Sequence, residues 1–256
     1  MQFPALHEAR FLTRLNRFAA MVMLEGKKVK VHIANSGRMR ELLQAGTRCY
    51  LFHRPGEHRK TAYDLGLVDI EGISESTESN PKASYISGYV SAVRQKQSMH
   101  SLVSTDSRVP NILVWEAWNA GVLPHFDGYT AGRREVSFHD SRLDMMLVGP
   151  AGRCYIEMKS VTLVIDHAAR FPDAPTGRGR KHIETLIKAV EEGHRAAVIF
   201  VIQRSDATCL SPYDANDPEF GTALRKAVEV GVEAYAFTCT LTQQEIIIAG
   251  EVPVLL

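Results

Sequence analysis

The stretch SRLDMMLVGPAGRCYIEMKSV, residues 141–161, decides how this chain folds. Two apolar segments flank the turn-forming residues 149–152, a pattern that predicts a β-hairpin. A loop of two or four residues centred there pairs residues whose numbers sum to 301, which places Asp144 opposite Glu157. Opposed residues project to one face with Cβ atoms about 4.5–5.5 Å apart. Lys159 shares this face because side chains alternate along a strand.

The three charged side chains that share this face of the hairpin predict a site, because unpaired charges are expensive to bury. Two carboxylates tolerate each other when a cation lies between them or when one is protonated. Asp144, Glu157 and the main-chain carbonyl of Met158 are therefore candidate ligands for Mg²⁺ or Mn²⁺. Lys159 is a candidate catalytic residue that would stabilise developing charge. The alternative is a structural salt bridge between Lys159 and one of the carboxylates.

A second charged segment, RFPDAPTGRGRKHIETL, spans residues 170–186 and leads into a helix expected over about residues 181–193. It contains four basic residues that are candidates for binding DNA phosphates: Arg170, Arg178, Arg180 and Lys181. Anions are favoured at helix N-termini, and cationic side chains add to this attraction. The alternative is a mobile, solvated loop. His182 has no partner that the sequence identifies, so we expect a surface or structural role for it.

Glu116 lies between two tryptophans in NILVWEAWNAG, residues 111–121, which predicts a helix ending at Gly121. It is a candidate fourth catalytic residue if it faces the metal, and a solvated helix residue otherwise. Just before this helix, Asp106 and Arg108 are expected to form a cap and an ion pair.

Near the N-terminus, the segment NSGRMRELL at residues 35–43 predicts a short helix capped by Asn35 or Ser36. Arg38 and Arg40 in this segment are candidate phosphate-binding residues. A capping turn without a ligand explains the same residues equally well.

The order of patterns along the chain predicts a mixed α/β protein. Short strand patterns dominate residues 9–75, which is typical of a five-stranded OB-type barrel that binds nucleic acid on one face. The polar segment 74–84 places a boundary near residue 80, so the expected domains are 1–80 and 81–256. In the second domain helices and strands alternate, which indicates an α/β layer fold.

Composition and charge restrict the class of protein. The 256 residues are 45% hydrophobic, enough for a large core, and the four cysteines show no CxxC spacing that would indicate zinc. With no secretory signal and no apolar run of about 18 residues, we expect a cytoplasmic protein that does not enter a membrane. Residues 1–60 hold 12 Lys and Arg against four Glu and no Asp. This asymmetry indicates either a nucleic-acid-binding head or a solvated basic surface.

Several blocks of this sequence resemble, in order, those of the sugar fermentation stimulation protein A family. The blocks within residues 104–224 are STDSRVPNILVWEA, SRLDMML, YIEMKSVTL, FPDAPTGRGRKHIETL and DPEFGTAL, and HIANSGRM resembles the N-terminal block. The resemblance implies an OB-like barrel followed by a domain similar to the PD-(D/E)xK nucleases.

The resemblance also implies roles for individual residues. Asp144 and Glu157 match the two acidic positions of the nuclease superfamily, and Lys159 matches its lysine. Glu116 would correspond to an acidic residue on the helix before the hairpin. The proline usual before the first acidic position is Leu143 here.

The resemblance implies a DNA-binding protein with a regulatory link to maltose metabolism. The motif adds a Mg²⁺-dependent nuclease acting on DNA or RNA as the first function to consider. Two others stay open: a DNA-binding regulator with an inert nuclease fold, and a metal-dependent hydrolase of a small phosphorylated metabolite. Nothing in the sequence indicates the oligomeric state.

Overall fold

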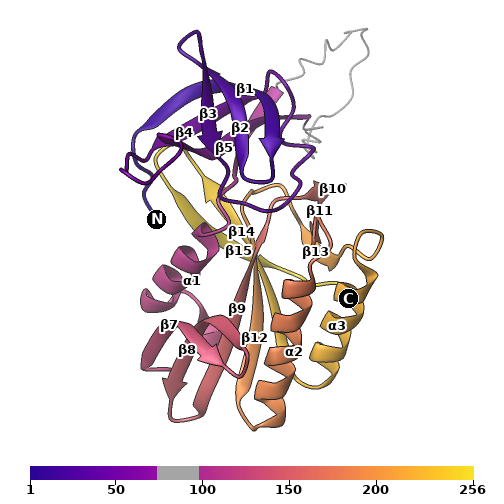
Figure 1. The fold of residues 1–256 in the computed structure, drawn as a ribbon. Helices are drawn as coiled ribbons and strands as arrows, with labels where there is room; N and C mark the ends of the chain where they lie inside the picture. The colour runs from indigo at the N-terminus through magenta and orange to yellow at the C-terminus, as the bar shows by residue number, and fades with distance from the viewer. Residues whose placement is uncertain (74–97) are drawn as a thin grey trace, which may run out of the picture.

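A computed structural model of the chain describes residues 1–73 and 98–256, which form a barrel above an α/β domain (Figure 1). The strands of the barrel are β1 (Leu6–Asn16), β2 (Ala19–Leu24), β3 (Lys27–His32), β4 (Arg48–His53), β5 (Tyr63–Ile73) and β6 (Ser98–Ser104). They are neighbours in the order β3-β2-β1-β4-β5-β6, and His32 of β3 pairs with Asp64 of β5. This pairing closes five of the strands into the predicted OB-type barrel.

The described part of the α/β domain contains a large mixed sheet, a smaller sheet and three α-helices. Its elements are α1 (Val109–Asn119), the short helix η1 (Pro124–Phe126), β7 (Ala131–Phe138), β8 (Ser141–Gly149), β9 (Gly152–Val161), α2 (Gly177–Glu191), β12 (Arg195–Ile202), α3 (Pro218–Glu229), β14 (Glu233–Leu241) and β15 (Ile246–Val252). The sheet order is β15-β14-β12-β9-β8-β7, with β12 parallel to both of its neighbours. A smaller sheet joins β10 (Val164–Ile165), β11 (Ala168–Phe171) and β13 (Cys209–Pro212). No helix within the described residues is long and apolar enough to cross a membrane.

Helices cover both faces of the large sheet (Figure 1). On one face α1 packs against Ile156, Met158 and Ile199; on the other, α2 and α3 pack against Tyr155 and Phe200. The central strand β12 is therefore buried on both sides, which explains its unbroken apolar sequence. Met158 points into the apolar layer under α1, as the alternation predicts.

The hairpin has the predicted register. Met145 pairs with Ile156 and Gly149 with Gly152, so the paired numbers sum to 301. The ladder stops at Met145, one pair short of Asp144 and Glu157. The two strands separate at this point, which frees the Asp144 side chain to bond elsewhere.

The expected helix at residues 35–43 is wrong. The chain forms a turn in which the Asn35 side-chain oxygen accepts a hydrogen bond from the Gly37 backbone N–H at 2.8 Å. Buried Met39 has a φ of 46°, outside the right-handed helical region. Its N–H donates to Asp173 of the α/β domain at 3.1 Å. A tertiary contact thus replaces the helical hydrogen bonding that local sequence favours.

Helix α2 begins at Gly177, four residues before the expected start, because Thr176 caps it by accepting from the Gly179 N–H at 2.9 Å. Helix α1 agrees with the sequence prediction, and Gly121 follows it with a φ of 68°. The expected domain boundary near residue 80 lies outside the described residues. Beyond it, β6 still pairs with β5, so the barrel sheet takes in residues up to Ser104.

Gly66 of β5 is a position where the barrel depends on a missing side chain. A Cβ atom at this residue would overlap the ring of Phe52. We expect Gly66→Ala to lower the free energy of unfolding by about 1–3 kcal/mol, since overpacking forces neighbours out of their rotamers. Urea denaturation measures this change.

The matched control is Gly250→Ala in β15, where a Cβ atom meets nothing within 4 Å. We expect this variant to stay within about 0.5 kcal/mol of the parent. Equal stability of the two variants would contradict the close packing of Phe52 on Gly66.

Candidate active site

Asp144 lies at a local irregularity of β8. Its neighbours Leu143 and Met145 pair with β7, whereas the pair between Asp144 and Glu135 is absent and Glu135 has a φ of 58°. The carboxylate accepts a hydrogen bond from the backbone N–H of Met158 at 2.7 Å. The Asp144 carboxylate therefore accepts the hydrogen bond that a backbone carbonyl of a paired strand would otherwise accept. It lies where β8 and β9 separate, beside the strand that carries Glu157.

Glu157 is 3% exposed and faces α2. One carboxylate oxygen, Oε1, accepts from Lys159 Nζ at 2.7 Å and from Nδ1 of His182. Burial alone would raise the pKa of Glu157, but the charge of Lys159 and the hydrogen bond from His182 outweigh it, so the pKa is lowered. Glu157 is thus held as a carboxylate in a nearly dry environment.

The environment of Asp144 has the opposite effect on the pKa of its carboxyl group. Burial, with the nearby charge of Glu157 second, raises the pKa of Asp144 to about 6. Hydrogen bonds from Met158 and from Asn111 Nδ2, at 2.8 Å, only partly offset this. The two carboxylates consequently repel each other above pH 6.

A divalent cation fits this pair. The second oxygen of Glu157, Oε2, is buried and has no hydrogen-bond partner in the described residues. An orphaned carboxylate oxygen beside a second carboxylate is a donor set that suits Mg²⁺, which fills its other positions with water and phosphate oxygens. Within the described parts of the chain, no three His, Cys, Asp or Glu side chains form a metal cluster. A cation here would have two carboxylate ligands, Asp144 and Glu157, and the main-chain carbonyl of Met158 stays a predicted third ligand.

The carboxylates lie in a pocket of about 340 Å³ between α1, β8, β9 and α2. The sequence did not assign to the site several residues that line it: Arg108, Asn111, Arg134, Glu135, Thr176 and His182. His182 is 7% exposed and contacts Glu157 directly, so of the two roles expected for it the surface one is wrong and the structural one stays open. A helix-period pattern does show that His182 shares the buried face of α2 with Ile183 and Leu186.

Glu116 does not join the site. Its side chain is 50% exposed and forms an ion pair with the N-terminal amine of Met1 at 2.9 Å. Asn111, five residues earlier on α1, faces the site instead and bonds Asp144. Five residues turn a helix by about 140°, so the two side chains point to different sides. The expected ion pair between Asp106 and Arg108 is present at 2.6 Å.

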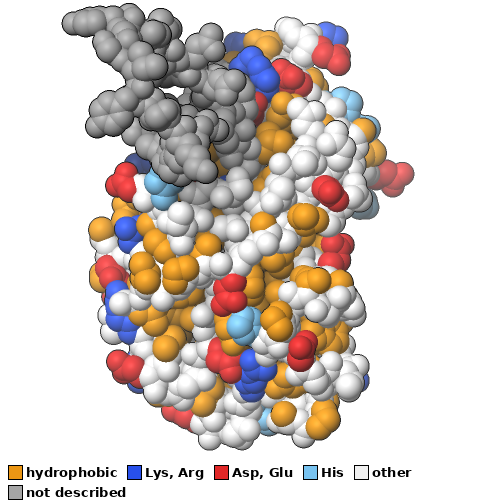
Figure 2. All heavy atoms as spheres, turned by 180° about the vertical axis from the view of Figure 1, so that it is seen from behind, with side chains coloured by type: hydrophobic (Ala, Val, Ile, Leu, Met, Phe, Trp, Pro, Cys, Tyr) orange, Lys and Arg blue, Asp and Glu red, His pale blue; other side chains and the backbone are white. Residues whose placement is uncertain are grey.

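Of the basic residues expected to bind phosphate, one lines the pocket. Arg178 lies on the first turn of α2, with its Nε 3.5 Å from His182 Nε2. The other five lie elsewhere: Arg38 bonds Asn216, Arg40 is exposed on the barrel, Arg170 bonds Ser211, Arg180 pairs with Asp217 and Glu219, and Lys181 pairs with Asp140. On the face seen in Figure 2, the Lys and Arg side chains of the described residues are scattered rather than gathered into one band.

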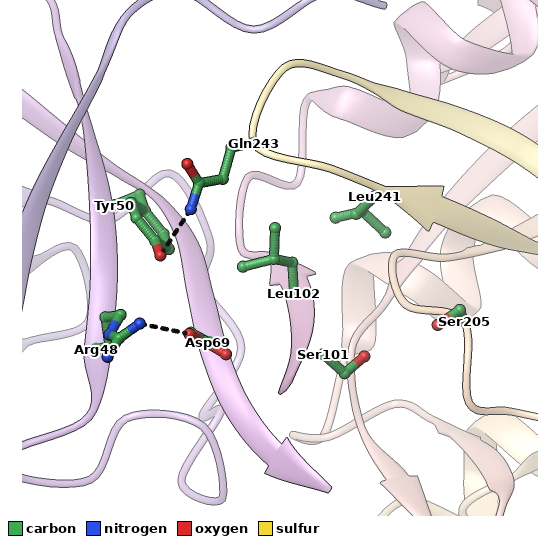
Figure 3. Close-up of a pocket in the computed structure, with 8 residues that line it drawn as sticks. All are labelled: Arg48, Tyr50, Asp69, Ser101, Leu102, Ser205, Leu241 and Gln243. Carbon is green, nitrogen blue, oxygen red and sulfur yellow. Dashed lines mark hydrogen bonds and ion pairs between the residues drawn. The ribbon is translucent and has the colours of Figure 1, made fainter. Parts of the chain in front are cut away.

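A second hollow, of about 370 Å³, lies between the barrel and the end of β14 (Figure 3). Its polar groups bond each other: Arg48 pairs with Asp69 at 3.7 Å, and Gln243 donates to the Tyr50 hydroxyl at 3.0 Å. It contains one carboxylate, already beside an arginine, so it lacks the paired acidic groups of the first pocket. We therefore place the candidate active site at Asp144 and Glu157.

Comparison with known families agrees with this architecture. A model described as the SfsA N-terminal OB domain matches residues 12–74, and one described as the sugar fermentation stimulation protein RE domain matches residues 108–245. The chain belongs to the sugar fermentation stimulation protein family. This confirms the resemblance stated from the sequence blocks.

Similar family members cover almost the whole chain. The sugar fermentation stimulation protein homologs of Desulforamulus reducens and Caldanaerobacter subterraneus are both 40% identical to it, over 98% and 97% of this chain and 93% and 96% of theirs. The structure of Pyrococcus furiosus SfsA in complex with Ca²⁺ is 27% identical, with a TM-score of 0.81 over 100% of this chain and 98% of that one. The two-domain fold is therefore that of the family.

The raised pKa of Asp144 has a measurable effect on stability. Because the folded protein binds this proton more tightly than the unfolded chain, the favourable contribution is present below about pH 4 and is lost as pH rises through about 6. We expect Asp144→Asn to raise the free energy of unfolding by about 1–3 kcal/mol at pH 8 with EDTA present. Below about pH 4 the gain should vanish. Denaturant titrations at the two pH values measure it.

The control for this prediction is Asp127→Asn, which removes an exposed carboxylate far from the pocket. Its unfolding free energy should change by less than about 0.5 kcal/mol at either pH. If Asp144→Asn changed the free energy of unfolding by the same amount at both pH values, the raised pKa of Asp144 would be contradicted.

Proposed function

We propose that this protein binds DNA and hydrolyses phosphodiester bonds with the help of a divalent cation. The observation that carries the proposal is the buried, unpartnered Oε2 of Glu157 beside the destabilised carboxylate of Asp144. Asp144 and Glu157 would hold Mg²⁺ or Mn²⁺. The cation supplies charge that polarises a phosphoryl oxygen and lowers the pKa of a bound water.

The surrounding side chains support the same chemistry. Lys159 keeps Glu157 ionised and brings an ammonium group to the place where negative charge would develop. His182 fixes Glu157 from α2, and Asn111 fixes Asp144 from α1. Arg178, on the wall of the pocket, is placed to bind a phosphate oxygen.

Two further points support the proposal. OB-type barrels commonly bind oligonucleotides, which favours nucleic acid as the substrate. The Pyrococcus furiosus relative is described in complex with Ca²⁺, a cation that takes carboxylate ligands as Mg²⁺ does, which favours a divalent cation. The DNA-binding part of the proposal also agrees with the regulatory link to maltose metabolism that the family resemblance implies.

Cleavage assays test the proposal. Purified protein incubated with single-stranded and plasmid DNA should cut it when Mg²⁺ or Mn²⁺ is added, and EDTA should stop the reaction. Glu157→Gln should lower the rate by at least ~100-fold, since it removes a ligand that is itself held by neighbouring groups. Glu184→Gln, on the exposed side of α2, should cut at the parent rate. Undiminished cleavage by Glu157→Gln would contradict the assigned site.

Metal binding is a separate prediction. Titration calorimetry with Mn²⁺ should show one site in the parent protein and a strongly weakened site in Glu157→Gln. If metal binds and DNA binds with log affinity linear in log salt, but no substrate is cut, the protein is a regulator with an inert nuclease fold. If neither DNA nor metal binds, the proposed function is wrong.

A further inference from the structure

Another hollow adjoins the active-site pocket at the start of α1. This third hollow, of about 410 Å³, lies between the first residues of the chain, β4 and the first turn of α1. It shares Arg108 and Ile112 with the active-site pocket. A strand lying in both of these hollows would follow a path from Glu157 to the barrel.

Buried carboxylates fix two arginines along this path. Asp64 and Asp106 are 1% and 7% exposed. Arg108 donates through Nη2 to Asp64 at 3.1 Å and to Asp106 at 2.6 Å, and Arg59 donates through Nη2 to Asp64. The carboxylates lie beneath the guanidinium groups, whose side chains are 54% exposed for Arg108 and 32% for Arg59.

The same arginines keep donors free for a ligand. Among the described residues, Nη1 of Arg59 and Nη1 of Arg108 have no hydrogen-bond partner, because Nε and Nη2 make the protein contacts. A guanidinium already fixed in position loses little entropy when it binds a phosphate, and its geometry suits phosphate oxygens. These two side chains are therefore preorganised phosphate binders.

A third arginine and one aromatic ring complete the surface. Arg54 is exposed, lies with its guanidinium carbon 5.8 Å from the centre of the Phe52 ring, and has no carboxylate partner in the described chain. Phe52 itself is buried, but Phe3 packs on it with ring centroids 5.4 Å apart and stays partly exposed. An aromatic ring beside cationic groups is an element that binds unstacked bases and phosphates of single strands. We name this surface, formed by Arg54, Arg59, Arg108 and Phe3, the arginine groove.

We propose that the arginine groove binds single-stranded DNA next to the phosphodiester that enters the active-site pocket, an inference that rests on the proposed function. Glu157 is 3% exposed, so a phosphate must enter the pocket to reach it. A single strand offers unstacked bases that can stack on Phe3 beside the arginines, whereas the bases of a duplex are stacked on each other. The groove then holds the neighbouring nucleotides of the same strand.

The test measures binding without turnover. A labelled single-stranded oligonucleotide of about 20 nucleotides is titrated with protein in EDTA, and fluorescence anisotropy gives Kd. We expect Arg54→Gln to weaken binding about three- to tenfold and to lower the slope of log affinity against log salt by about 0.7, the value for one lost phosphate contact to a single strand. Arg54→Glu should weaken binding further.

The matched control is Arg153→Gln, which removes an exposed arginine at the hairpin turn, away from both hollows. It should bind like the parent protein, and duplex of the same sequence should bind more weakly than the single strand. Unchanged affinity of Arg54→Glu, or tighter binding of the duplex, would overturn the inference. Binding in EDTA does not depend on catalysis, so absence of cleavage in the assay with Mg²⁺ or Mn²⁺ would count against the proposed hydrolysis alone, whereas these outcomes count against the groove alone.

Discussion

The buried ion pair between Glu157 and Lys159, made on one strand, is the constraint around which the candidate active site is arranged. Placing two charges at 3% and 7% exposure costs several kcal/mol per ion before any attraction is gained. Lys159 and His182 compensate one oxygen of Glu157, while the other has no partner among the described residues. Hydrophobic residues of similar volume would fill the same space at no such cost, so the retained charge points to chemistry rather than to stability.

The hairpin shows how much of the site follows from sequence. A loop with an even number of residues fixed the register, and alternation placed Glu157 and Lys159 on the face opposite Met158, as the structure has them. The same pattern does not reveal that β8 leaves the ladder at Asp144. That departure depends on a left-handed residue, Glu135, in the neighbouring strand, and no local signal in the hairpin reports it.

Contacts between distant segments account for the other differences. The acidic side chain of Glu116 made it a candidate catalytic residue. In α1, however, Asn111 points toward Asp144, and Glu116 lies on the outer side of the helix. The barrel turn near residue 39 depends on Asp173, which is more than 130 residues away. Most element types are thus encoded locally, whereas the turn near residue 39 and the direction of individual side chains are not.

Arg108 connects the two domains at the point where the site opens. Its guanidinium bonds Asp106 on its own segment and Asp64 in the barrel, and Asp64 also accepts from Arg59. Asp64 closes the barrel as well, through its pairing with His32. A carboxylate that closes the barrel therefore also sets the position of an arginine on the wall of the active-site pocket. Since Asp64 is buried and bonded to both arginines, the barrel cannot shift relative to α1 without uncovering this carboxylate. The barrel is in this way part of the site's geometry, because a residue of β5 holds Arg108 on the wall of the pocket.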